Sequence, residues 1–203
     1  MIARRSALLV ALLAALAPFT AACGGSDAMR VTSPFSPELV PFFDDAVDFI
    51  AAPDRLEGRW ADDWMAETQQ RVRNADLITR VRVETLHSDS DPERRTSYRI
   101  VVRALGDPLY GEPPETGRFE LRAHESSPGF ATVRENERRL AQGEHLVFVK
   151  WYEDDMGTVR AHWHLSPASS RVIRRVQRLV SLRTGDSERG VEIYRSTTVT
   201  EED

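Results

Sequence analysis

Two histidines placed two positions apart are the residues in this chain best arranged to do chemistry. His162 and His164 flank Trp163 in a stretch where apolar residues alternate with polar ones. In a strand, residues two apart share one face and lie about 6 to 7 Å apart, so both imidazoles could reach one metal ion. A zinc site needs three or four ligands; the candidates for the others are His124, Glu144, His145 and Asp155. One interpretation of the pair is a metal site, which would make this a metal-binding protein or a metal-dependent hydrolase. The alternative is that both histidines face solvent on the outside of a barrel and have no chemical role.

The other polar clusters lack the spacing that known chemistry requires. Asp89, Asp91 and Glu93 alternate like the opening of a calcium loop, but the glycine and the distal glutamate of that loop are missing. No Gly-x-Ser-x-Gly, His-Glu-x-x-His or phosphate-loop motif occurs. The four tryptophans occupy periodic apolar positions, which predicts core packing. We therefore expect no cofactor and a non-catalytic binding or structural role.

A stripe of arginines marks the last predicted helix. Its apolar positions, such as Val172 and Val176, face inward, and four arginines face outward at Arg171, Arg174, Arg175 and Arg178. Such a face could bind an acidic protein or lipid headgroups, the alternative being simple solvation. Without the first 22 residues, 25 basic residues face 32 acidic ones, a net charge of −7, because Arg4 and Arg5 are removed from the 27. That balance argues against nucleic acid as a partner.

The first 22 residues have the form of an export signal. Arg4 and Arg5 precede an apolar run, Ser6 to Phe19, which is shorter than the roughly 20 residues of a membrane-spanning helix. The sequence Thr20-Ala21-Ala22-Cys23 that follows resembles the lipobox of bacterial lipoproteins, with Thr20 in place of the usual leucine. The resemblance implies cleavage before Cys23, acylation of that residue and anchoring in a bilayer. An ordinary secretory signal with an incidental cysteine is the alternative.

The remaining chain divides into a tether and one folded domain. Residues 23–37 carry the anchor and a tether rich in glycine, serine and proline. Residues 38–74 predict two helices, the first over 41–52 from the spacing of its phenylalanines. Residues 75–183 predict strands near 77–86, 98–102, 119–123, 146–151 and 159–165, with a helix over 128–143 before the fourth and a final helix. Residues 184–203 predict a polar tail with at most one weak strand at 191–194.

Three strands, a helix and two strands form the element order of an OB-fold barrel. With helices on both sides, the chain resembles the netrin-like variant of that fold. The resemblance implies an α+β domain with a five-stranded antiparallel barrel and terminal helices packed on it. The chain lacks that family's disulfides, since Cys23 is its single cysteine.

These features together predict a lipid-anchored protein of a bacterial cell envelope that binds a protein or another envelope component near the membrane. Gly24 follows the anchor where an enterobacterial inner-membrane retention signal would place aspartate, so the resemblance favours the outer membrane. A purely structural spacer is the remaining alternative.

Overall fold

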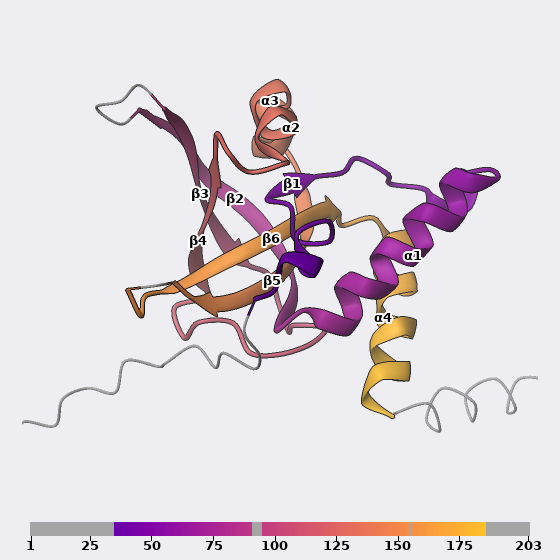
Figure 1. Cartoon of the computed structure of the whole chain (residues 1–203). Coiled ribbons are helices and arrows are strands. Elements are labelled where there is room, and N and C mark those ends of the chain that lie inside the picture. Colours follow the sequence, from indigo (N-terminus) through magenta and orange to yellow (C-terminus); the bar gives the residue numbers. More distant parts are fainter. Residues whose placement is uncertain (1–34, 91–94, 155, 186–203) are drawn as a thin grey trace, which may run out of the picture.

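A strongly curled sheet of six strands organises the domain, with helices on its outer face and at one end (Figure 1). The computed structural model describes residues 35–90, 95–154 and 156–185. The strand order is β1-β6-β5-β2-β3-β4. The strands are β1 (Ala46–Val47), β2 (Leu77–Ser90), β3 (Thr96–Ala104), β4 (Arg118–His124), β5 (Glu144–Glu153) and β6 (Val159–Pro167). The predicted α+β class is confirmed.

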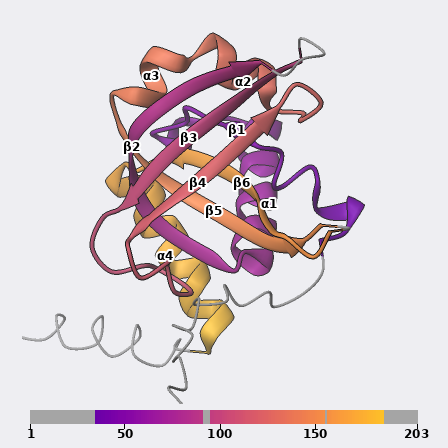
Figure 2. The ribbon, with the colours of Figure 1, turned by 90° about the vertical axis from the view of Figure 1, so that its left-hand side faces the viewer.

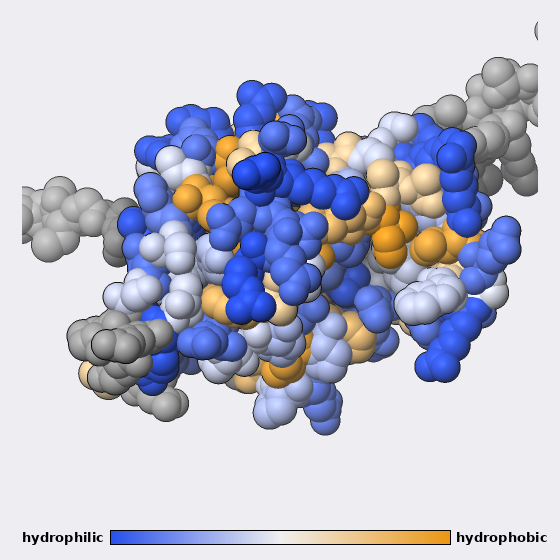
Figure 3. Space-filling model, turned by 90° about the horizontal axis from the view of Figure 1, so that it is seen from above, coloured by the Kyte–Doolittle hydropathy of each residue, from blue (hydrophilic) through white to orange (hydrophobic). Residues whose placement is uncertain are grey.

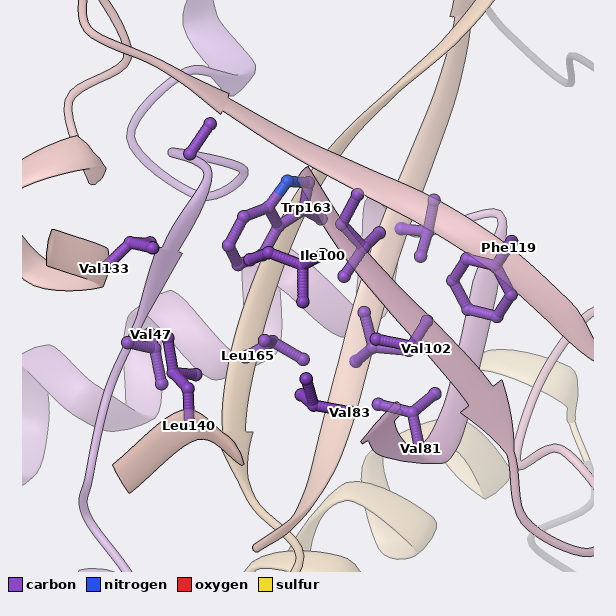
Figure 4. Close-up of a cluster of buried hydrophobic side chains, with 14 of the residues drawn as sticks. Val47, Val81, Val83, Ile100, Val102, Phe119, Val133, Leu140, Trp163 and Leu165 are labelled. Carbon is purple, nitrogen blue, oxygen red and sulfur yellow. The ribbon is translucent and has the colours of Figure 1, made fainter. Parts of the chain in front are cut away.

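Alternation along each strand gives the sheet two apolar faces. Leu77 and Val81 of β2 point into the curl, whereas Ile78 between them points outward. The inner face forms one cluster with Ile100, Val102 and Trp163, which Figure 4 shows converging from several strands. Phe130 and Val133 of α2 (Phe130–Glu135) and Leu140 of α3 (Glu137–Ala141) join this cluster. These two short helices therefore cover one end of the curl.

Two longer helices cover the outer face. Helices α1 (Arg59–Asn74) and α4 (Ser170–Thr184) lie behind the sheet in the view of Figure 2. Trp64 and Val72 of α1 and Val172 and Val176 of α4 pack with Phe148 of β5 in a second buried cluster. Burial of apolar surface, worth about 25 cal/mol per Å², holds both helices on the sheet.

The predicted closed barrel of five antiparallel strands is wrong. The five long strands are antiparallel to their neighbours, but β1 pairs in parallel with β6, and no hydrogen-bonded ladder joins β6 to β4 among the described residues. The edges approach each other where the Trp163 indole Nε1–H donates to the Arg122 carbonyl oxygen over 2.9 Å. Trp163 fills the gap with its side chain, so the sheet remains a curled half-barrel.

Two of the predicted helices also differ. Residues 41–52 contain turns and β1 in place of a helix, with Asp45 in the left-handed region at φ 55°. The reason is that this segment buries Phe43 in the outer cluster while its aspartates bind side chains of β6. The helix predicted over 128–143 is broken at Asn136 into α2 and α3.

Several predicted segments lie outside the described residues: the signal, Cys23, most of the tether, Asp91, Glu93, Asp155 and the strand at 191–194. Within the described part of the chain, none of the helices combines the length and apolar character that crossing a bilayer demands. The surface seen from above is mainly hydrophilic, with apolar side chains in separate small patches (Figure 3). Trp60, expected in the core, is 77 % exposed, whereas Trp64, Trp151 and Trp163 are buried.

Candidate functional site

The histidine pair lies on the outer face of β6, as its alternation predicts, but it does not face solvent. The segment Asp44 to Asp48, which includes β1, runs alongside and covers it. His164 is buried, with 4 % of its side chain exposed, and His162 is partly buried. Their apolar neighbours Trp163 and Leu165 lie in the inner core. The expectation of solvent-facing histidines is therefore wrong.

His164 lies between two carboxylates. Its Nδ1 is 2.8 Å from Asp44 Oδ1, and its Nε2 is 3.3 Å from Asp48 Oδ2. Asp48 Oδ2 also accepts the Ser166 hydroxyl proton over 2.6 Å, and Asp48 Oδ1 accepts the Ile50 backbone N–H over 2.8 Å. His164 therefore bridges Asp44 and Asp48 through its two ring nitrogens.

His162 makes a second contact with the same segment. Its Nδ1 is 3.1 Å from Asp45 Oδ2, which also accepts the Ser127 hydroxyl proton over 2.8 Å. The imidazole ring packs against Phe35 and Tyr152, with ring centroids 4.2 and 4.7 Å away, and those two rings also contact each other at 5.4 Å. Burial and the nearby Asp45 charge raise the pKa of Tyr152, so its hydroxyl stays protonated at neutral pH. Asp45 thus joins β6 to the loop that precedes α2.

The hydrogen bonds around Asp48 favour the ionised form of its carboxyl group. Burial opposes ionisation of the carboxyl group, but the hydrogen bond and charge of His164, together with bonds from Ser166 and the Ile50 backbone, outweigh it. The pKa of Asp48 therefore lies below its ordinary value. An ionised Asp48 is part of the folded state, and protonating it weakens the bridge.

The other proposed metal ligands do not join the pair. His145 is buried with its Nε2 3.0 Å from the Leu140 carbonyl, and Glu144 accepts a bond from Arg82. His124 is exposed at the end of β4, and Asp155 lies outside the described residues. Among the residues described, no group of three or more histidine, cysteine, aspartate or glutamate side chains is arranged to hold a metal ion. Both histidines instead tie the 44–48 segment to β6.

The arginine stripe borders a groove formed by the two outer helices. The groove has a volume of about 950 Å³ and lies between α1, α4 and the turn at Pro53–Arg55. All four arginines predicted as a binding face line it, namely Arg171, Arg174, Arg175 and Arg178. The remaining lining is largely apolar and consists of Pro53, Leu56, Ala61, Trp64 and Met65, with Asp54 as the acidic member.

The four arginines differ in what they contact. Arg171 Nη1 pairs with Asp54 Oδ2 over 2.7 Å, and Arg175 Nε points at the Met65 sulfur over 3.1 Å. Arg174 and Arg178, one helical turn apart, have no hydrogen-bond or ion-pair partner among the described residues. Guanidinium groups bind carboxylates in a bidentate manner. This part of the groove is therefore suited to an anionic group.

Trp64 at the wall of the groove supplies a second polar feature. Its side chain is buried, yet its indole Nε1–H lacks an acceptor in the described structure. A buried N–H without an acceptor costs about 1 to 3 kcal/mol.

Sequence reasoning found the histidines and the arginines but missed their partners. Asp44, Asp45 and Asp48 fall in the segment 41–52 that the spacing predicts as a helix, and Trp64, which lines the groove, is predicted to pack in the core. The one local signal was the density of acids in residues 44–48. No family model, curated protein or solved structure matches this chain.

Proposed function

We propose that this protein is a lipid-anchored lipoprotein of a bacterial cell envelope whose domain binds an acidic segment of an envelope protein. The binding site is the groove between α1 and α4. The bilayer is contacted through acylated Cys23, with the outer membrane as the favoured location. The protein acts as a binding module and not as a catalyst.

The observation that carries the proposal is the composition of the groove. Four arginines on one side of α4 face an apolar wall on α1, and two of them have no partner in the described structure. Like charges at helical spacing repel one another, so a solvated stripe gains nothing from this arrangement. An acidic peptide with apolar side chains would pair with Arg174 and Arg178 and cover Leu56 and Met65.

The fold supports a binding role in a different way. We infer that the sheet is an opened variant of an OB-type barrel, because the order of strands and helices agrees and Trp163 spans the gap between β6 and β4. The histidine bridges fasten the segment that follows the tether to β6. Tension from the anchor is thereby transmitted to the sheet, away from the groove.

Cross-linking in cells tests the function. A photoreactive residue at Ala61, which lines the groove, should cross-link to an envelope protein, whereas one at the exposed Gln177 should give less. The double variant Arg174→Glu, Arg178→Glu should lose the cross-linked product. A control variant, Arg138→Glu on an exposed part of α3, should keep it. A product that survives charge reversal in the groove would disprove this binding site.

A further inference from the structure

The chain leaves the arginine-bearing helix and continues into an acidic segment. Helix α4 ends at Thr184, and Gly185 follows in the left-handed conformation at φ 74°, which turns the chain away from the helix axis. Residues 186–203 then contain six acidic and two basic side chains. The segment is thus attached directly to the helix that lines the groove.

Its length is sufficient to return to the groove. Arg178 precedes Gly185 by seven residues, which is about 10 Å of helix at 1.5 Å per residue. Arg174 lies about 6 Å further along by the same measure. The 18 residues from 186 to 203 reach at most about 60 Å when extended. Chain length therefore allows every part of the groove to be reached.

The chemistry of the segment matches that of the groove. Three consecutive acids, Glu201, Glu202 and Asp203, are complementary to Arg174 and Arg178. An apolar group in the middle of the segment, Val191, Ile193 and Tyr194, corresponds to the apolar wall.

We propose that residues 186–203 occupy the groove of their own chain as an internal pseudo-ligand. A segment joined to its site by a short connection has an effective concentration in the millimolar range. An external acidic partner must then displace it, so the segment sets a threshold for binding. The inference rests on the proposed function of the groove and adds to it the identity of the resident occupant.

The test uses the full chain, isolated with its anchor in detergent, with the photoreactive residue at Ala61. Peptide mapping should show an intramolecular cross-link to residues 186–203. Arg174→Glu, Arg178→Glu should reduce that product at least tenfold, and Arg138→Glu should leave it unchanged. Replacing Glu201, Glu202 and Asp203 by arginine in the variant that carries Arg174→Glu and Arg178→Glu should restore the intramolecular cross-link. A cross-link to detergent-borne lipid, to a second copy revealed by mixed isotope labelling, or to no part of 186–203 would overturn the proposal.

A binding measurement separates this inference from the function on which it rests. A synthetic peptide of residues 186–203 should bind to a chain that ends at Gly185. Its affinity should be lower at high salt than at low salt, because salt screens exposed charges. The shortened chain should also give more of the envelope cross-link in cells. Suppose that the cross-link to an envelope protein depends on Arg174 and Arg178 but is no more abundant in the shortened chain than in the full chain. The internal ligand is then refuted, and the proposed function of the groove stands. If the peptide binds but no envelope product forms, the function is refuted.

Discussion

Removing the Asp48 carboxylate should destabilise the domain more than removing the Asp44 carboxylate. Asp48 accepts three hydrogen bonds, from Ser166 Oγ, the Ile50 backbone N–H and His164 Nε2. Ser166 and His164 are both buried. A buried donor left without its acceptor costs about 1 to 3 kcal/mol, so losing these contacts together should cost about 3 to 5 kcal/mol. We expect Asp48→Ala to fall in that range, a large share of a total stability of about 5 to 15 kcal/mol.

Two further variants should lose less stability than Asp48→Ala. Asp48→Asn keeps the shape and one acceptor oxygen, so about 1 to 3 kcal/mol should be lost. Asp44→Ala removes one bond of a more exposed carboxylate to the other nitrogen of His164, and about 1 to 2 kcal/mol should be lost. Urea unfolding followed by tryptophan fluorescence measures all three. With a slope of about 2 kcal/mol per molar, Asp48→Ala should lower the midpoint by about 1.5 to 2.5 M.

The pH dependence has a definite sign. The pKa of Asp48 is lowered in the folded protein, so its contribution is complete above the unfolded value near 4 and is lost as pH falls through the folded value. The gap between the unmodified protein and Asp48→Asn should therefore narrow in acid. A double variant with His164→Ala should cost less than the sum of the single changes, because they share one interaction. Refutation would be an Asp48→Ala midpoint no lower than that of Asp44→Ala, or a gap unchanged in acid.

Three further changes probe other parts of the molecule. Burial lowers the pKa of His145, so the unmodified protein should lose stability as pH falls from 7.5 to 5.5, and His145→Leu should lose less in the same urea titrations; equal slopes would contradict this. Gly129→Ala should cost about 1 to 3 kcal/mol, because a methyl group there would overlap the Ala46 Cβ and backbone. Gly143→Ala, with its nearest neighbour at 3.5 Å, should be nearly neutral by thermal unfolding. Cys23→Ser should abolish acyl labelling and cleavage before residue 23, as measured by metabolic labelling and mass spectrometry of the membrane fraction; unchanged labelling would refute the anchor.

Local periodicity was sufficient to predict most of the elements. Apolar alternation located the five long strands, and the spacing of Trp64 and Val72 located the body of α1, because these patterns depend on residues close together in sequence. The same logic placed both histidines on one face of β6 and four arginines along α4. It failed for residues 41–52, where the spacing of apolar residues suits a helix but the backbone bends to give Phe43 and the three aspartates separate partners.

The sequence by itself determined the five long strands, helices α1 and α4, and the acidic balance of the chain. It also contains a signal with the form of a lipoprotein leader, which stays a prediction. Only the tertiary structure decided that the sheet remains open, that His164 lies between Asp44 and Asp48, and that an apolar wall faces the arginines. The contacts of His164 join residues 120 and 116 positions apart. Which groups meet across such separations depends on how the strands pair and how the helices pack on them, and no local pattern records that pairing.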